Sequence, residues 1–280
     1  MNYRHIYHAG GFSDVFKHVI LTHVLLYLRG KDAPFCVLDT HAGIGVYDLD
    51  SPEALKTGEA QEGIHRLLAC ESHPEALKPY IEAVLAVNGG AGPVHRYPGS
   101  PALAHHFLRP GDRLVLAELH PADARTLKRL YQDDPRVATH SMDGYTALKA
   151  HLPPVEKRGA VLTDPSFEVP DEFSAMAAGL VTAWHRWPGG TYMLWYPVKE
   201  RATIWRFEET LIASGIRRIL KAEMLVHPED DPFRLNGCGM IIVNPPWQLK
   251  GTLEEVLPFL CRTLAPAGQG SGSVTWLVPE

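Results

Sequence analysis

The sequence has few cysteines and no long apolar run. Four cysteines are spread over 280 residues and no C-x-x-C occurs, which excludes a disulfide framework and a zinc ribbon. The longest nearly apolar stretch, Val19 to Leu28, is interrupted by Thr22 and His23 and is shorter than the roughly 20 apolar residues that cross a bilayer. The start of the chain, MNYRHIYHAGG, has neither a secretory nor a transit signal. We therefore expect a soluble, cytoplasmic protein.

The sequence also lacks an excess of positive charge. Its 27 lysines and arginines face 32 aspartates and glutamates, giving a net charge of -5, whereas binding a polyanion requires concentrated positive charge. Any nucleic-acid interface must therefore be local. Two groups of side chains are candidates: Arg4, His5, His8, Lys17 and His18 near the start of the chain, and Lys199, Arg201, Arg206, Arg217, Arg218 and Lys221 further along. Ordinary solvated charges explain the second group equally well.

Three ligand-binding motifs are missing. Neither the G-x-G-x-x-G dinucleotide fingerprint nor the G-x-x-x-x-G-K-[ST] phosphate loop occurs, which favours a cofactor without a pyrophosphate over NAD or ATP. The 15 histidines include no H-E-x-x-H motif or other tight ligand spacing, so we expect no metal site. His41 is the histidine best placed to bind a ligand, because it lies in a glycine-containing loop after a predicted strand.

Short apolar runs alternate with helix-compatible segments along the chain. The first run, Phe35 to Asp39, ends on an acid. The later runs are Leu114 to Ala117, Gly159 to Thr163, Thr191 to Tyr196, Ile219 to Val226 and Met240 to Val243. This alternation predicts an α/β fold with a mostly parallel sheet and helices on both faces. In such sheets, ligands bind beyond the carboxyl ends of the strands.

Two serines mark predicted helix starts. Ser13 precedes a segment whose apolar residues recur at helical spacing up to Gly30, so we predict that Ser13 caps this helix. Ser100 precedes Pro101 and an apolar helical segment, and we predict that it is the N-cap there. A helix start at this place can also face a ligand, so Ser100 is a candidate for both roles.

One interval breaks the alternation. Helical patterns near Glu59 to Ala69 and Pro74 to Val87 precede the second predicted strand, and a glycine-rich loop follows them. We therefore predict an inserted helical subdomain over residues 46–96. The main domain then comprises residues 1–45 and 97–280.

Polar residues and glycines follow the predicted strands in a regular order. They are Asp39 with His41 and Gly43 after the first strand, Glu118 after the second, Asp143 with Gly144 after the third, and Asp164 with Pro165 after the fourth. A glycine loop lets the backbone approach a nucleoside cofactor, and a carboxylate after the second strand can accept both ribose hydroxyl hydrogens. A single acid after a strand is more often a turn former or helix cap, but the ordered set favours a cofactor site.

The fourth strand leads into Asp164-Pro165-Ser166-Phe167, which resembles the (D/N/S)-P-P-(Y/F/W) motif of enzymes that methylate exocyclic amino groups of bases. The lone pair of such a nitrogen is delocalised into the ring, so the nitrogen is a poor nucleophile. The Asp164 carboxylate and the Pro165 carbonyl can each accept one amino hydrogen, and Asp164 can receive the proton that transfer releases. Phe167 can stack on an unstacked base. Serine replaces the second proline of the motif, which leaves the turn less rigid.

A second tetrapeptide, Asn244-Pro245-Pro246-Trp247, matches the same motif at every position. It follows the run Met240 to Val243. The final strand of a methyltransferase sheet is usually antiparallel, so the end of this strand would face away from a cofactor. We therefore assign the chemistry to Asp164 and predict a proline turn packed by Trp247 at the second copy.

Longer strings resemble one family. YRHIYHAGGFSDVFKH, LDTHAGIGVYDL, YPGSP, LAELHP, DGY, WYPV, NPPW and VTWLVPE look like the bacterial RlmJ-type methyltransferases, which make N6-methyladenine in large-subunit (23S) ribosomal RNA. The similarity spans nearly the whole chain, including the helical insertion. It implies a Rossmann-like, class I S-adenosyl-L-methionine-dependent methyltransferase with a seven-stranded sheet.

The resemblance also implies roles for individual residues. It places the cofactor against His18, His41, Ser100, Glu118, Asp143, Gly144 and Asp164. It makes Asp164 the proton acceptor and assigns Tyr3 to the RNA, within an amino-terminal flap over the target adenine. We expect a cytoplasmic monomer that binds ribosomal RNA and uses neither a membrane nor a metal. Two alternatives stay open: a DNA adenine-N6 methyltransferase, and an RNA-binding relative whose catalysis is impaired by Ser166.

Overall fold

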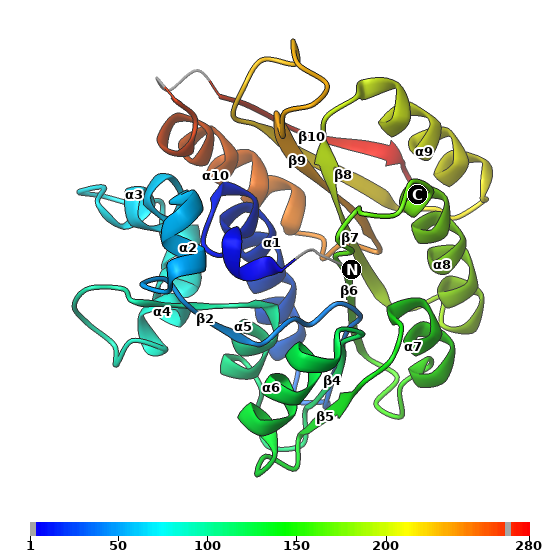
Figure 1. The fold of residues 1–280 in the computed structure, drawn as a ribbon. Coiled ribbons are helices and arrows are strands. Elements are labelled where there is room, and N and C mark those ends of the chain that lie inside the picture. Colours follow the sequence, from blue (N-terminus) through cyan, green and yellow to red (C-terminus); the bar gives the residue numbers. More distant parts are fainter. Residues whose placement is uncertain (1–3, 267–269) are drawn as a thin grey trace.

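The computed structural model describes residues 4–266 and 270–280. Eight strands form one sheet in the order β10-β8-β9-β7-β6-β1-β4-β5 (Figure 1). They are β1 (Cys36–Asp39), β4 (Arg113–Ala117), β5 (Val137–His140), β6 (Gly159–Thr163), β7 (Thr191–Val198), β8 (Ile219–Leu225), β9 (Gly237–Val243) and β10 (Ser271–Val278). The predicted number of seven is wrong by one, because β10 is a largely exposed edge strand without a buried apolar run.

Strand direction separates the two edges of the sheet. β1, β4, β5, β6 and β7 run parallel to one another, so their carboxyl ends lie along one edge, which we call the carboxyl edge. β9 runs antiparallel to β7 and β8. Val243, the last residue of β9, pairs with Tyr192 near the start of β7. The end of β9 therefore lies at the opposite edge, as predicted.

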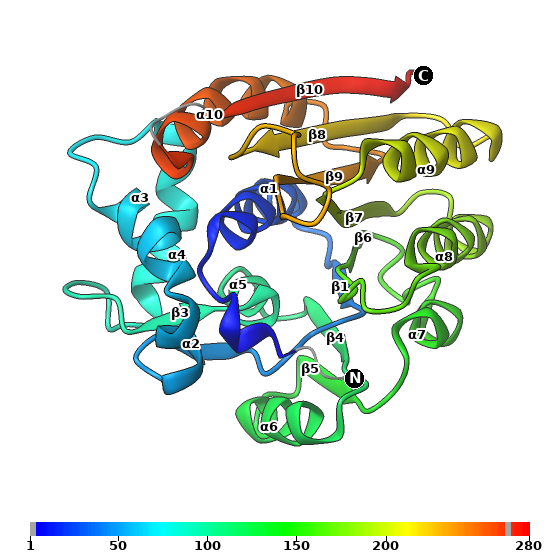
Figure 2. The ribbon, with the colours of Figure 1, turned by 45° about the horizontal axis from the view of Figure 1, so that its top comes forward.

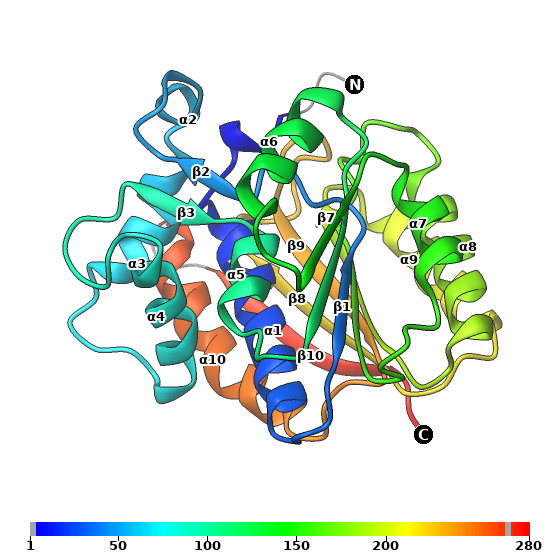
Figure 3. The same ribbon diagram turned by 90° about the horizontal axis from the view of Figure 1, so that it is seen from below.

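Helices cover both faces of the sheet, because successive strand residues point to opposite faces and both sets are apolar. Leu162 and Leu116 face the first cluster, whereas Val161 and Val115 face the second. The first face packs against α1 (Phe12–Arg29), α5 (Ser100–His106), α6 (Pro121–Tyr131) and α10 (Leu249–Leu264), and the second against α7 (Gly144–His151), α8 (Glu172–Arg186) and α9 (Arg201–Ala213) (Figure 3). Within the described residues, none of these helices has the length and apolar character of a membrane span.

Glycines, not serines, precede two helices at the carboxyl edge. α1 begins at Phe12 with Gly11 as its N-cap, so the predicted cap at Ser13 is wrong. α5 begins at Ser100 with Gly99 as its N-cap, so the predicted capping role of Ser100 is also wrong. A side chain at either glycine would collide with neighbouring atoms. The Ser100 hydroxyl is consequently free of capping.

Residues 46–98 form a helical layer beside α1 and α10 (Figure 2). β2 (Val46–Asp48) and β3 (Arg96–Pro98) pair antiparallel. Between them lie α2 (Pro52–Thr57), η2 (Gln61–His65), α3 (Arg66–Leu68), η3 (Glu75–Leu77) and α4 (Lys78–Ala86). η2 kinks at Gly63, where a Cβ would lie 2.0 Å from the Gly10 carbonyl oxygen. Buried Tyr80 and Tyr97 belong to the same hydrophobic cluster as α1, so the layer shares the core of the main sheet.

Candidate active site

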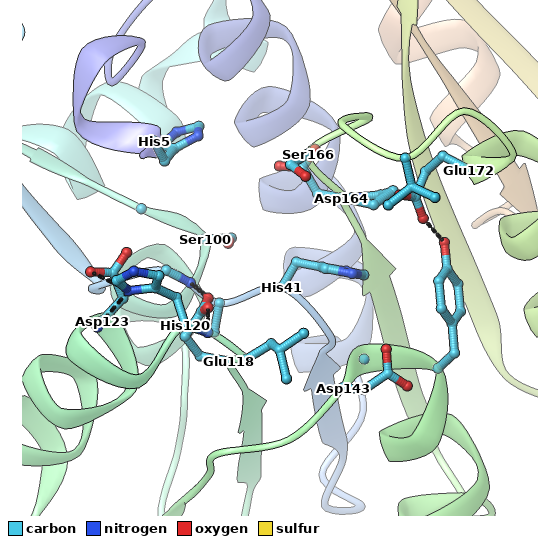
Figure 4. Close-up of a pocket in the computed structure, with 18 of the residues that line it drawn as sticks. His5, His41, Ser100, Glu118, His120, Asp123, Asp143, Asp164, Ser166 and Glu172 are labelled. Atoms are coloured by element: carbon cyan, nitrogen blue, oxygen red, sulfur yellow. Dashed lines mark hydrogen bonds and ion pairs between the residues drawn. The ribbon is translucent and has the colours of Figure 1, made fainter. Parts of the chain in front are cut away.

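A cavity of about 260 Å³ opens at the carboxyl edge, where open α/β sheets bind ligands. Its wall combines the ends of β1, β4 and β6 with the starts of α6, α7 and α8 and with the amino-terminal segment (Figure 4). The cavity brings together eight residues that the sequence singled out. They are His41, Gly43, Ser100, Glu118, Asp143, Gly144, Asp164 and Pro165.

Other residues of the predicted site do not line this cavity. His18 is fully buried in α1, and its Nδ1 lies 2.8 Å from the Tyr97 hydroxyl. Phe167 adopts a φ of 54°, and its ring lies against Phe173 and Trp195, with centroid distances of 4.9 and 6.0 Å. Its ring therefore joins the hydrophobic cluster on the second face of the sheet. Tyr3 lies outside the described residues.

Two backbone amides hold the Glu118 carboxylate in place at the end of β4. The Gly43 N–H donates to Oε2 over 2.8 Å, and the His120 N–H donates to Oε1 over 2.7 Å. Burial raises the pKa of Glu118, and the amide bonds offset this only in part. Each oxygen keeps a further lone pair. The group can therefore accept the hydroxyl hydrogens of a ribose in a fixed orientation.

Glycines allow the close backbone approaches that shape the cavity. Gly43 has a φ of 62°, and a Cβ there would lie 2.1 Å from the Tyr47 hydroxyl oxygen. A Cβ on Gly144 would lie 2.5 Å from the Thr40 carbonyl oxygen. Any side chain at either position would have to displace the loop after β1 or Tyr47.

Asp143 precedes Gly144 and caps α7. Its Oδ2 accepts hydrogen bonds from the N–H and the hydroxyl of Thr146, over 2.7 and 2.8 Å. Capping is the ordinary structural role of an aspartate here. Because only one carboxylate oxygen serves the cap, Oδ1 is available to accept a ligand amino hydrogen.

His41 presents a neutral ring to the cavity. The Thr40 hydroxyl donates to the Leu162 carbonyl over 3.0 Å, so its single hydrogen is used. His41 Nδ1, 2.8 Å from the same hydroxyl oxygen, must then be the donor. Nε2 is left as an acceptor. Burial lowers the pKa of His41 to about 4, so the ring stays neutral at neutral pH.

A buried ion-pair network supports Asp164. The Lys17 ammonium contacts Asp164 Oδ2 and lies 2.9 Å from Asp14 Oδ1. His5 Nε2 lies 2.9 Å from the other Asp14 oxygen. Burial alone would lower the pKa of Lys17, but the two carboxylates outweigh it and raise that pKa well above its usual value. Asp164 therefore faces a permanent cation through Oδ2, and its Oδ1 has no hydrogen-bond partner in the part of the chain that the structure describes.

The prediction that Lys17 and His18 belong to a surface that meets RNA is wrong, because they are only 4% and 0% exposed. Asp14 offered a signal, since it lies three residues before Lys17 on one helix and such residues face each other. The contact between Lys17 and Asp164 joins positions 147 residues apart. Local sequence patterns contain no trace of it. Sequence reasoning also missed other lining residues, among them Tyr47, Leu119, His120, Asp123, Tyr145, Val169 and Glu172.

The second group of candidate cations is mostly paired. Arg201 lies 2.8 Å from Glu223 and 2.6 Å from Glu229, and Lys221 lies 2.7 Å from Glu208. These pairs tie α9 to β8 and to the loop that follows it. Their geometry agrees with structural charges and not with a basic surface.

The second tetrapeptide lies at the opposite edge of the sheet. The Asn244 side-chain amide donates to the carbonyls of Pro188 and Gly190, over 2.8 Å each, at the start of β7. Trp247 is 76% exposed, so the prediction that it packs a proline turn is wrong. The antiparallel course of β9 removes this copy from the cavity.

The chain is similar to known proteins over almost its whole length. Residues 32–278 match the family described as Ribosomal RNA large subunit methyltransferase D, RlmJ. Over the full length of both chains, the sequence is 43% identical to Ribosomal RNA large subunit methyltransferase J of Escherichia coli (strain K12) and 41% identical to that of Haemophilus influenzae (strain ATCC 51907 / DSM 11121 / KW20 / Rd). A crystal structure of a Legionella pneumophila protein superimposes with a TM-score of 0.88 at 34% identity, covering 96% of this chain and 98% of that one. The chain therefore belongs to the RlmJ family of large-subunit ribosomal RNA methyltransferases.

Proposed function

We propose that this enzyme transfers a methyl group from S-adenosyl-L-methionine to the N6 amino group of an adenine in 23S ribosomal RNA. The position of Asp164 carries the proposal. Its carboxylate follows β6 at the carboxyl edge, lines the cavity beside Pro165 and contacts Lys17. The names of the relatives supply the ribosomal RNA substrate, and the tetrapeptide supplies the amino-group chemistry.

The donors and acceptors of the site fit this cofactor. Glu118 would accept the ribose hydroxyl hydrogens, and Asp143 with Gly144 would hold the adenine end. Ser100, His41 and His18 would hold the methionine end. Two buried polar atoms, Asp39 Oδ2 and His18 Nε2, have no hydrogen-bond partner among the described residues. An acceptor and an imidazole nitrogen of this kind suit the ammonium and carboxylate of a methionine moiety. When bound, the sulfonium supplies an electrophilic methyl group.

Asp164 and Pro165 would prepare the amino group for attack. Asp164 Oδ1 accepts one amino hydrogen and the Pro165 carbonyl accepts the other, which directs the nitrogen lone pair toward the methyl carbon. The bound cofactor would supply its methyl group to this nitrogen, and Asp164 would receive the proton that the nitrogen releases. The contact with the Lys17 ammonium would hold the Asp164 side chain in place beside the amino group.

The amino-terminal segment would form a flap over the target base. Arg4 lies 3.0 Å from Asp123, and His5 lines the cavity mouth (Figure 4). Tyr3 adjoins them in sequence, and we propose that it contacts the RNA. Stacking of Phe167 on the base belongs to the same proposal. It requires the segment after Pro165 to change conformation, since the Phe167 ring packs against Phe173.

We further propose a cytoplasmic monomer that needs no metal. Residues 46–96 would be an inserted subdomain within a methyltransferase domain of residues 1–45 and 97–280. The partner of the protein would be the RNA of the large ribosomal subunit.

A side-by-side transfer assay tests the function. Purified enzyme receives labelled cofactor with large-subunit ribosomal RNA from cells lacking this protein, or with unmethylated DNA. We expect label in the RNA alone, recovered as N6-methyladenosine. Label in the DNA would favour the DNA enzyme. Cofactor binding without any transfer would favour an RNA-binding relative impaired by Ser166.

A further inference from the structure

Three buried side chains link the helical layer to α1. His18 Nδ1 lies 2.8 Å from the Tyr97 hydroxyl, which lies 2.9 Å from the Tyr80 hydroxyl. All three side chains have no exposed surface. Tyr80 belongs to α4 and Tyr97 to β3, so both come from the layer of residues 46–98. The chain of hydrogen bonds ends on His18, one residue after a wall residue of the cavity, Lys17.

The donors and acceptors of these hydrogen bonds can be assigned. In the described part of the chain, the Tyr80 hydroxyl contacts no polar side chain except that of Tyr97. If Tyr80 donates to Tyr97 and Tyr97 donates to His18 Nδ1, both hydroxyl hydrogens are used. The reverse direction would leave the Tyr80 hydrogen buried without an acceptor, which is costly. His18 therefore carries its own hydrogen on Nε2.

His18 Nε2 is then a donor for which the described residues provide no acceptor. It is buried and has no hydrogen-bond partner among residues 4–266 and 270–280. Burial lowers the pKa of His18 to about 3, so the ring is neutral and offers an N–H, not a charge. His18 and Tyr97 are close in sequence to residues of the cavity wall: Lys17 precedes His18, and Gly99 and Ser100 follow Tyr97 by two and three positions. A bound ligand is the partner that this arrangement lacks.

Resting on the proposed function, we infer that Tyr97 and Tyr80 are positioning residues for the cofactor. They fix His18 in the tautomer whose Nε2–H binds the carboxylate of the methionine moiety. That carboxylate is the only anionic group of S-adenosylmethionine, and an N–H bound to a carboxylate makes a charge-assisted hydrogen bond. The helical layer thereby contributes to cofactor affinity through residues that do not touch the cofactor.

Two ligands that differ in the methionine moiety test this inference. Calorimetry measures binding of S-adenosylhomocysteine, which has the carboxylate, and of 5′-methylthioadenosine, which lacks it. We expect Tyr97→Phe to weaken S-adenosylhomocysteine binding about tenfold and to leave methylthioadenosine binding unchanged. Tyr80→Phe should weaken the first by about threefold, because Tyr97 can still donate without it.

A matched control separates positioning from general damage. Tyr192 is another buried tyrosine, whose hydroxyl donates to the Trp187 carbonyl over 2.7 Å at the start of β7. Tyr192→Phe removes a comparable hydrogen bond far from the cavity and should leave the affinity ratio of the two ligands unchanged. Thermal unfolding without ligand shows whether each variant is folded. If Tyr97→Phe does not fold, the affinities of Tyr80→Phe for the two ligands test the inference.

Three outcomes decide the matter. Equal weakening of both ligands by Tyr97→Phe would overturn the inference, since it indicates a merely structural role. In a His18→Phe background, Tyr97→Phe should add no further loss, and an undiminished effect there would show that Tyr97 does not act through His18. If the wild-type protein binds neither ligand, the proposed function itself fails, and this inference with it.

Discussion

The two tetrapeptides share a motif and differ in almost everything around it. Asp164 follows a parallel strand and lies in a cavity, in contact with a buried lysine. Asn244 follows an antiparallel strand, and both hydrogens of its amide are used on the carbonyls of Pro188 and Gly190. The second copy matches the motif at every position, whereas the first carries Ser166 in place of a proline. Strand direction, not agreement with the motif, is therefore our reason for proposing Asp164 as the chemical site.

Buried aspartates at the two edges of the sheet also differ in their hydrogen bonds. At the carboxyl edge, Asp39 and His18 each keep a buried polar atom that has no hydrogen-bond partner within residues 4–266 and 270–280. At the opposite edge, Asp112 accepts hydrogen bonds from the Phe35 N–H and from Arg109, so a turn of the chain uses both of its oxygens. These two aspartates therefore differ: Asp39 keeps an oxygen without a partner among the described residues, whereas both oxygens of Asp112 are used.

The largest effect should come from Asp164→Asn. It removes the charge that attracts Lys17 and the group that accepts the proton, so we expect methyl transfer to fall at least about 10³-fold. The matched change Asn244→Ala should leave the rate per folded molecule unchanged. Transfer of labelled methyl groups to unmodified ribosomal RNA measures both. Equal losses in the two variants would contradict the choice between the tetrapeptides.

The second effect concerns pH. Burial raises the pKa of Asp39 to about 6, so the stability that its neutral form contributes is present below about pH 4 and lost as pH rises through 6. Asp39→Asn cannot titrate, and its unfolding free energy relative to wild type should rise by about 2–3 kcal/mol between pH 4 and pH 7. Urea unfolding across this range measures the difference.

Asp112 should show the opposite dependence of stability on pH. Burial alone would raise its pKa, but the hydrogen bonds from Arg109 and Phe35 outweigh burial and lower it. Its stabilising effect is therefore present at neutral pH and lost in acid. Asp112→Asn should destabilise most near pH 7 and least at low pH. Parallel profiles for the two variants would refute the contrast between the edges.

A smaller effect is expected from Asn244→Ala on stability. The residue has a φ of 51° and donates two hydrogen bonds. Alanine loses both bonds and tolerates this backbone conformation poorly, so the unfolding free energy should fall by about 2 kcal/mol. Urea unfolding measures it. No loss would mean that Asn244 does not stabilise the contact between the end of β9 and the loop before β7.

The smallest effect is expected from Trp247→Ala. The side chain is 76% exposed, and changes at exposed positions usually alter the unfolding free energy by less than about 0.5 kcal/mol. Binding of S-adenosylhomocysteine should not change. A clear loss of cofactor affinity, measured by calorimetry, would bring the second tetrapeptide back into consideration.

Much of the fold and of the cavity wall could be predicted because both depend on local patterns. The predicted run Gly159 to Thr163 has the same first and last residues as β6. The two agree because buried parallel strands are continuous apolar runs. Glu118, Asp143 and Asp164 could be grouped because parallel strands end at one edge. β10 could not be recognised from its largely exposed residues.

The remaining errors come from contacts between distant segments. The crowding that selects Gly99 as an N-cap involves the loop after β1 and Tyr47. In the sequence Lys17 resembles a surface cation, because its contact with Asp164, which follows β6, depends on the fold. His18 contacts Tyr97, and Tyr97 contacts Tyr80, both from the helical layer of residues 46–98. In each case the partner is set by the fold, and no spacing in the sequence encodes it.

A crystal structure with S-adenosylhomocysteine would show which of the two tetrapeptides faces the cofactor. We expect one ligand in the cavity at the carboxyl edge, with its ribose on Glu118 and its sulfur facing Asp164. A ligand bound beside Asn244, or one whose sulfur faces away from Asp164, would contradict the claim that strand direction selects the first tetrapeptide.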